Sequence, residues 1–148
     1  MVTIDQIKQL REETGVSVTE CKKALEESGG DFEKAKEVLR RLGKELAEKR
    51  AGKETGQGLI DSYIHPNKKV GVLLDIRCES DFVARSEDFQ VLSHEVCLQI
   101  AAMAPSVNNI LAQSWIKDSS KTIGGVIDSY IAKLGERIVI QRFERFEI

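Results

Sequence analysis

The sequence lacks a long apolar run, both within the chain and near its start. Its longest apolar stretches, such as residues 72–74 and 100–104, are much shorter than the roughly 20 residues that cross a bilayer. Charged side chains, among them Asp5, Lys8 and Arg11, interrupt the first turns, where a secretory signal would be apolar. These absences predict a cytoplasmic protein without a membrane-spanning segment.

The sequence also lacks an excess of positive charge and an even set of cysteines. Its 22 lysine and arginine residues are balanced by 24 aspartate and glutamate residues, with both signs mixed along the chain. Because a row of phosphates requires a basic stripe, direct binding of nucleic acid is not expected. Cys21, Cys78 and Cys97 are odd in number and widely spaced, which argues against disulfides and indicates buried thiols.

Residues 1–50 have the periodicity of three short helices. Thr3 to Gln6 and Ser17 to Glu20 have the spacing of capping boxes, and Asp31 follows a Ser-Gly-Gly break that ends the second helix. Apolar side chains recur at helical spacing in each segment: Ile4, Ile7 and Leu10; Cys21, Ala24 and Leu25; Phe32, Ala35, Val38, Leu39 and Leu42. We therefore expect a compact three-helix module.

A change of composition separates this module from the rest of the chain. Residues 51–58 contain three glycines and no apolar periodicity, which indicates a linker. Residues 59–65 and 69–79 then have the pattern of two strands joined by a Pro-Asn-Lys turn. In the second strand, alternate residues from Val70 to Cys78 are apolar, so one face of an antiparallel hairpin should be buried.

The remaining residues predict two helices and a closing strand. Ser86 caps a helix that ends near Pro105, residues 122–134 form another despite two glycines that cost roughly 1 kcal/mol each, and residues 138–148 are rich in β-branched and aromatic side chains. One stripe of the first helix should hold Phe89, Leu92, Val96, Ile100 and Met103. The predicted fold class is α+β: a three-helix bundle (1–50), a linker (51–58), and a three-stranded antiparallel sheet packed with helices (59–148).

The common signatures of enzymes and cofactor sites are incomplete. Residues 56–58 (Gly-Gln-Gly) lack the third glycine of a dinucleotide loop and precede a strand instead of following one. Residues 114–117 match the Ser-x-x-Lys spelling of one nucleophile, but its companion motifs do not occur. His94 and Cys97 are too few for a zinc site, so a surface histidine beside a core cysteine is expected. The sequence predicts no catalytic residue, metal or cofactor.

Residues 79–88 place an apolar pair among charges at a strand end. In one interpretation Phe82 and Val83 enter the core and the charges form a solvated rim, which composition alone favours. In another, an exposed aromatic side chain flanked by charges anchors a protein interface. A carboxylate pair for acid–base catalysis is a third interpretation, without a histidine or a pocket-forming loop to support it.

Residues 78–85, which read Cys-Glu-Ser-Asp-Phe-Val-Ala-Arg, strongly resemble the hallmark C-E-T-D-F-V-A-R of the elongation factor Ts family. Residues 10–15 and 21–25 are similar to the N-terminal signature of that family, and residues 135–143 are similar to its closing strand. The resemblance implies a nucleotide exchange factor, not an enzyme, with a ubiquitin-associated-like first module. The implied partner is the translation GTPase elongation factor Tu, in its GDP-bound and nucleotide-free forms.

The resemblance also implies which residues contact that partner. In the family, the aspartate and phenylalanine of the hallmark press against the GTPase near its magnesium and nucleotide phosphates; the matching residues are Asp81 and Phe82. Ser80 and Val83 complete the motif. The first module of the family packs on the GTPase through apolar residues, for which the counterparts here are Leu10 and Val18.

Three departures from the family pattern have consequences. Ser80 replaces threonine, a mild change because either hydroxyl can cap a helix, and Thr19 stands where the family often has a bulky apolar residue. Residues 105–121 are short where long members insert a second half-core and a coiled-coil hairpin. Half a core leaves an apolar face or sheet edge uncovered, so we expect a homodimer. Candidate contact residues are Val139, Phe143 and Phe146.

Two alternative functions remain. The first module could bind ubiquitin or nascent chains through its own apolar patch, although this leaves residues 58–148 without a role. A small hydrolase could use Asp81, Glu87 or Asp88, and it would turn over a substrate without any partner protein.

Overall fold

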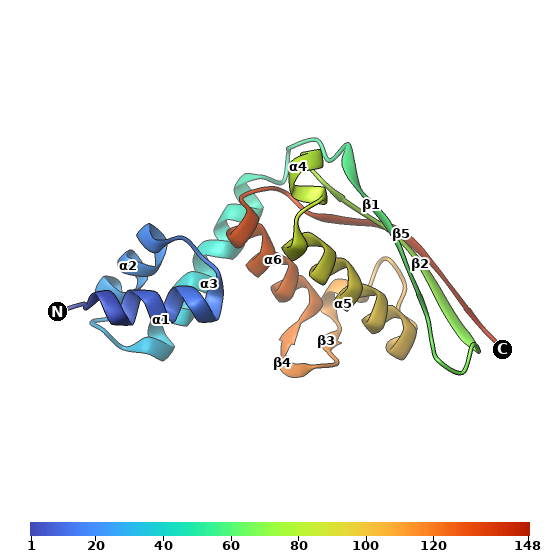
Figure 1. Ribbon diagram of the computed structural model, residues 1–148, viewed down its shortest axis with the longest axis horizontal. Helices are drawn as coiled ribbons and strands as arrows, with labels where there is room; N and C mark the ends of the chain where they lie inside the picture. The colour runs from blue at the N-terminus through green and yellow to red at the C-terminus, as the bar shows by residue number, and fades with distance from the viewer.

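Three helices form the N-terminal bundle of the computed structural model, which describes residues 1–148 (Figure 1). They are α1 (Ile4–Thr14), α2 (Val18–Glu27) and α3 (Phe32–Lys49). The predicted helix starts are confirmed, because the side chains of Thr3, Ser17 and Asp31 each accept a hydrogen bond from the amide three residues further on. The first capping box is complete, whereas at Ser17 only the hydroxyl half is formed.

A small core of its own holds the bundle together. The fully or nearly buried residues are Leu10, Val16, Cys21, Ala24, Leu25, Ala35 and Leu39. The predicted inner face of α1 is shorter than expected, since Ile4 is 72% exposed and only Leu10 of that face is fully buried. Gly15 ends α1 in the left-handed conformation (φ 70°), which a side chain would disfavour.

The second unit contains the predicted three-stranded antiparallel sheet. Its strands are β1 (Gln57–Ile64), β2 (Val70–Cys78) and β5 (Val139–Glu147), with β2 in the centre. The pairing of Tyr63 with Val72, and of Val72 with Arg145, sets the register at the hairpin end. The α+β fold class predicted from the sequence is therefore confirmed.

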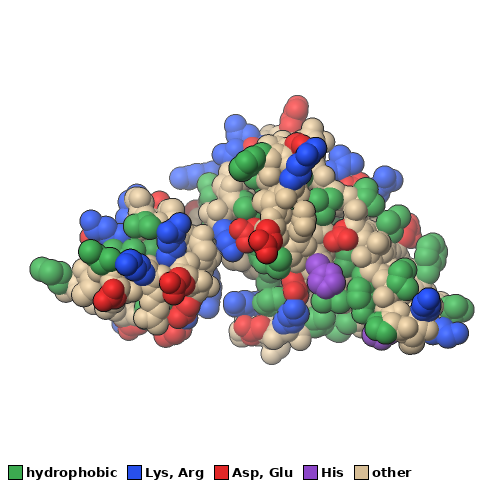
Figure 2. All heavy atoms as spheres, in the orientation of Figure 1, with side chains coloured by type: hydrophobic (Ala, Val, Ile, Leu, Met, Phe, Trp, Pro, Cys, Tyr) green, Lys and Arg blue, Asp and Glu red, His purple; other side chains and the backbone are tan.

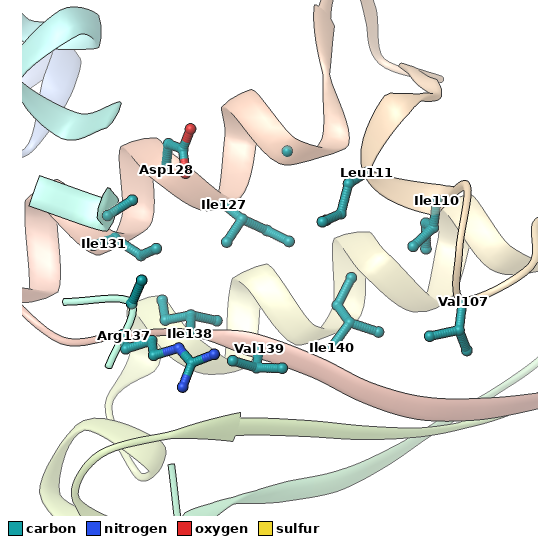
Figure 3. Close-up of a pocket in the computed structure, with 13 residues that line it drawn as sticks. Val107, Ile110, Leu111, Ile127, Asp128, Ile131, Arg137, Ile138, Val139 and Ile140 are labelled. Carbon is teal, nitrogen blue, oxygen red and sulfur yellow. The ribbon is translucent and has the colours of Figure 1, made fainter. Parts of the chain in front are cut away.

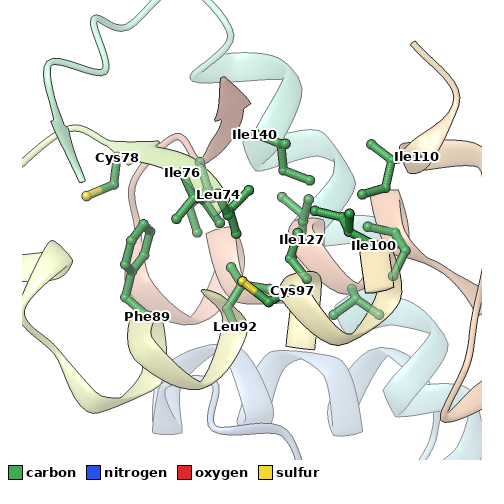
Figure 4. Packing of buried hydrophobic residues seen from close by; sticks show 14 of the residues in the cluster. Leu74, Ile76, Cys78, Phe89, Leu92, Cys97, Ile100, Ile110, Ile127 and Ile140 are labelled. Atoms are coloured by element: carbon green, nitrogen blue, oxygen red, sulfur yellow. The ribbon is translucent and has the colours of Figure 1, made fainter. Parts of the chain in front are cut away.

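Helices cover one face of this sheet. They are the one-turn α4 (Asp81–Ala84), α5 (Glu87–Met103) and α6 (Ile123–Leu134). The core between them and the sheet contains 18 buried residues, among them Leu74, Phe89 and Ile127 (Figure 4). The predicted stripe of α5 is buried except for Met103, which is 51% exposed at the end of the helix. None of these helices has the combination of length and hydropathy that a membrane span requires.

The segment between α5 and α6, for which the sequence predicts no helix or strand, is structured. It contains a short 3-10 helix, η1 (Ile110–Ala112), and a small hairpin of β3 (Ser114–Trp115) and β4 (Asp118–Thr122). The buried side chain of Gln99 holds this hairpin, because it donates to the carbonyl oxygen of Ser114 at 3.0 Å and accepts from the amide of Ile116 at 2.9 Å. Such long-range hydrogen bonds leave no periodic signal in the sequence.

The two units share a helix. The first half of α3 packs in the bundle, while Leu46 and Ala47 near its end pack against the larger core. Gly43 lies where α3 meets α6: a Cβ atom there would be 3.1 Å from the carbonyl oxygen of Asp128. In Figure 1 the bundle lies on the left, the sheet on the right, and α3 extends from the bundle to α6.

Candidate protein-binding site

The hallmark segment forms α4, a one-turn helix directly after β2. Ser80 is its N-cap, with an extended backbone, and its hydroxyl accepts a hydrogen bond from the amide of Val83 at 3.2 Å. Asp81 occupies the first turn and pairs with Arg85 at 2.8 Å, with both side chains largely in solvent. The helix lies at the end of the sheet opposite the C-terminus (Figure 1).

The apolar pair of the hallmark is divided between the surface and the core. Val83 is 6% exposed and belongs to the larger core, as the core interpretation requires. Phe82 is 87% exposed, so the same interpretation is wrong for this residue. Adjacent helical residues point about 100° apart, which is why one can be buried while its neighbour faces water. An exposed phenylalanine beside an exposed carboxylate has the chemistry of an interface anchor.

A carboxylate just before α4 joins three segments. Glu79 accepts two hydrogen bonds from Arg50, at 2.7 and 2.6 Å, and a third from the backbone amide of Arg137. The Arg50 guanidinium, followed by the Arg137 amide, lowers the pKa of Glu79 from 4.5 to about 2 against the opposing effect of burial. The end of α3, the end of β2 and the segment before β5 therefore meet at one ion pair.

A second carboxylate holds the N-cap itself. One oxygen of Glu136 accepts from the amide of Ser80 at 2.9 Å, and the other accepts from the Ser80 hydroxyl at 2.6 Å. We call this group of residues the strand-end network: Arg50, Glu79, Ser80, Glu136 and Arg137. No local pattern in the sequence points to Arg50 or Glu136, since they lie 29 and 56 residues from their partners. The only sequence signal was Glu136 within a segment similar to the family.

The thiol of Cys78, the residue before Glu79, is held inside the protein. It is fully buried and donates to the carbonyl oxygen of Ser80 at 3.2 Å. Burial, followed by the charge of Glu136, raises the pKa of Cys78 to about 11. All three cysteines are free and buried, as predicted.

The two candidate residues of the N-terminal bundle differ in accessibility. Val18 is 49% exposed at the start of α2, beside the exposed Thr19. Leu10 is fully buried in the small core. The expectation that Leu10 itself contacts a partner does not fit this position, because its side chain already fills the space between the three helices.

The residues of the incomplete zinc and Ser-x-x-Lys motifs have ordinary structural positions. His94 is exposed on α5 while Cys97 is fully buried, as the surface-histidine interpretation predicted. Ser114 begins β3, and Lys117 forms an ion pair with Glu95. On the face shown in Figure 2, acidic and basic side chains are interspersed and no single-sign stripe is present.

An apolar cavity of about 400 Å³ lies between α6, η1 and the start of β5 (Figure 3). Ile127 and Ile131 of α6 face Val139 and Ile140 of β5 across it, with Val107 near one end. Phe82 does not line this cavity, whereas Arg137 of the strand-end network does. Val107, Ile110 and Leu111, from the connection between α5 and α6, line one side of it.

The sequence is similar to those of known proteins. Residues 79–148 match the family model described as Elongation factor TS. The chain is 40% identical to the elongation factor Ts of Coprothermobacter proteolyticus, over 99% of this chain and 98% of that protein. It is 38% identical to that of Leptospira biflexa serovar Patoc, with the same coverage, and 37% identical to that of Moorella thermoacetica, over 100% of this chain and 96% of that protein.

These alignments extend over 193 or 194 positions, more than the 148 residues of this chain, so the relatives contain residues without a counterpart here. The identity nevertheless covers the N-terminal bundle as well as the sheet and its helices. The chain belongs to the elongation factor Ts family.

Proposed function

We propose that this protein acts in translation elongation as a guanine nucleotide exchange factor for elongation factor Tu. The observation that carries the proposal is the exposure of Phe82, 87%, on a one-turn helix held by hydrogen bonds and by the burial of Val83. An aromatic side chain in water contributes nothing to the stability of the free protein. Its position is suited to an anchor that is buried only in a complex.

The mechanism requires two actions at the nucleotide site of the partner. The ring of Phe82 inserts between packed elements of the GTPase, and the carboxylate of Asp81 changes the groups around its magnesium ion. Magnesium tolerates little departure from octahedral oxygen geometry. Loss of the metal leaves the phosphate charges poorly compensated, so GDP is released. Ser80 and Val83 act indirectly, by capping and anchoring the helix that carries both side chains.

Such a factor makes and breaks no covalent bond. It binds the nucleotide-free GTPase more tightly than the GDP-bound form, and linkage requires that GDP weakens the factor by the same ratio as the factor weakens GDP. The direction of exchange then follows from the cellular excess of GTP. This is the basis for proposing a binding protein and not an enzyme.

The N-terminal bundle, residues 1–50, is proposed as the module that docks on the GTPase, with a ubiquitin-associated-like arrangement. Val18 is its proposed exposed apolar contact, and Leu10, which is fully buried, is part of the core that holds the three helices together. A second, separate contact raises the affinity of the complex without taking part in nucleotide release. The exchange residues and the docking residue lie on different units of the chain.

A homodimer is proposed through the face of the sheet that no helix covers. Ile60, Ile64, Leu73 and Phe146 are 54–75% exposed there, and Gly71 pairs with both Ile64 and Phe146. Phe146 of the predicted contact residues is on this face. Phe143 packs partly buried against the core on the other face, so it is not part of the proposed contact. Two such faces could cover each other isologously.

The test is the release of a fluorescent GDP from elongation factor Tu. Wild-type protein should accelerate release, and Phe82→Ala should reduce the stimulated rate by about 10-fold or more, since a buried aromatic anchor contributes about 2 kcal/mol or more. Phe82→Ala should keep the wild-type unfolding midpoint, because the ring is exposed. Failure of the wild-type protein to accelerate release would refute the proposal.

A further inference from the structure

The direction of Phe82 is determined by residues outside its own helix. Helix α4 contains four residues. A helix of one turn is not stable alone, because nucleation fixes several backbone dihedrals for one hydrogen bond. Val83 and Ala84 are buried and anchor one side of the turn. The other end, where Ser80 leads into Asp81 and Phe82, is held by the strand-end network.

Glu136 controls the hydroxyl of the N-cap. The Ser80 hydroxyl donates its single proton to one oxygen of Glu136, at 2.6 Å. The lone pairs of the same hydroxyl are then free to accept from the amide of Val83, at 3.2 Å. Glu136 also accepts from the Ser80 amide, at 2.9 Å. Glu136 therefore accepts hydrogen bonds from both the backbone and the side chain of Ser80.

Arg50 connects this turn to the N-terminal bundle. It is the C-cap residue of α3, and it holds Glu79 with two parallel hydrogen bonds. The planar guanidinium fixes the direction as well as the distance of the carboxylate. Glu79 is adjacent to Ser80, the N-cap of α4. The Arg50–Glu79 pair therefore links α4 to α3, which is also part of the N-terminal bundle.

From this geometry we infer that Glu136 and the Arg50–Glu79 pair are positioning residues for nucleotide exchange: they hold Phe82 and Asp81 in the orientation that reaches the magnesium site while the bundle is docked. The inference rests on the proposed exchange function. It extends that function to three residues, none of which is required to touch the GTPase.

Positioning predicts a specific kinetic signature. Glu136→Ala should lower the maximal rate of stimulated GDP release by about 10-fold, since misplacing a reacting group by about 1 Å can cost even more. The factor concentration that gives half-maximal stimulation should change by less than about 2-fold, because Val18 and the docking module are intact. Glu136→Gln keeps one acceptor oxygen and should restore part of the rate.

The Arg50–Glu79 pair is tested by a double-mutant cycle. Arg50→Ala and Glu79→Ala should each lower the maximal rate by about 5-fold, and the double variant should be no slower than the slower single variant. Arg41→Ala is the control. Arg41 is also in α3, and the change removes its exposed ion pair with Glu27 of α2 (2.9 Å). This control should keep the wild-type rate.

Amide hydrogen exchange of Val83 and Ala84 in the full-length variants reports directly on α4. Faster amide exchange together with a lower maximal rate of GDP release supports the inference. Wild-type GDP release in Glu136→Ala, or independent effects in the Arg50–Glu79 cycle, overturns it while leaving the exchange function in place. A wild-type protein that does not stimulate release refutes the function and the inference together.

Discussion

Gly43 of α3 and Asp128 of α6 meet where the two units of the chain join. A Cβ atom at Gly43 would lie 3.1 Å from the carbonyl oxygen of Asp128 and 3.2 Å from the Cβ atom of Ala132. Both distances are shorter than most packed side-chain contacts. The absence of a side chain therefore permits the close approach of α3 to α6.

The first prediction follows from this approach. Gly43→Leu should destabilise the protein by about 2 kcal/mol, because added atoms must separate the two helices. Gly43→Ala should have a smaller effect, since its helix propensity offsets part of the strain. Urea unfolding measures both. Gly52→Ala is the control, with open space around the added carbon, and an equal loss of stability in Gly52→Ala would contradict the explanation.

The second prediction concerns Asp81 and magnesium. Asp81→Ala should slow stimulated GDP release by about 3-fold, less than Phe82→Ala, and should reduce the dependence of the rate on added magnesium. The variant should remain folded, because Asp81 is exposed and its ion pair with Arg85 lies in solvent. Glu87→Gln, at the start of α5, should behave as the wild type. Unchanged magnesium dependence in Asp81→Ala would argue against a role at the metal.

The third prediction concerns self-association. The wild-type protein should have the mass of a dimer by light scattering at tens of micromolar concentration. Phe146→Glu or Leu73→Lys should yield a monomer with an unchanged fold, since both side chains are exposed on the uncovered face of the sheet. Val91→Glu changes an exposed apolar residue of α5 and should leave the dimer intact. A wild-type monomer would refute the proposed contact.

The fourth prediction is a pH dependence of stability. The pKa of Glu79 is lowered from 4.5 to about 2 in the folded state, so its pair with Arg50 stabilises the protein fully above about pH 5 and loses that effect as the pH falls toward 2. Glu79→Gln should be less stable than the wild type at pH 7 by on the order of 1 kcal/mol, since the pair retains some contact with water. Urea unfolding at pH 7, 4 and 3 should show this difference shrinking; a constant difference would contradict it.

The fifth prediction concerns the N-terminal unit. Residues 1–50 should retain helical circular dichroism when isolated, because seven buried residues form a core within the unit. The last turns of α3 should fray, since Leu46 and Ala47 lose their partners in the larger core. The remaining unit should bind elongation factor Tu more weakly than the full chain. Complete loss of helicity on excision would show that residues 1–50 are not an independent module.

The sequence alone determined the local structure and the family. Helix starts at Thr3, Asp31 and Ser86 are predictable because a capping side chain bonds to an amide only three residues away. The alternation in β2 predicts its buried face, because successive side chains of a strand point to opposite faces of the sheet. The hallmark at residues 78–85 identified the segment that carries the candidate site, although not the direction of its side chains.

Only the tertiary structure decided which of those side chains are available to a partner. Phe82 and Val83 are both apolar and adjacent, and packing against the sheet and α5 selects Val83 for the core. The same holds for Leu10, which the small core buries, and for Glu136, whose partner Ser80 is 56 residues away. Such contacts depend on how elements far apart in the sequence pack together. Residue spacing along the chain predicts only local structure, so it does not predict these contacts.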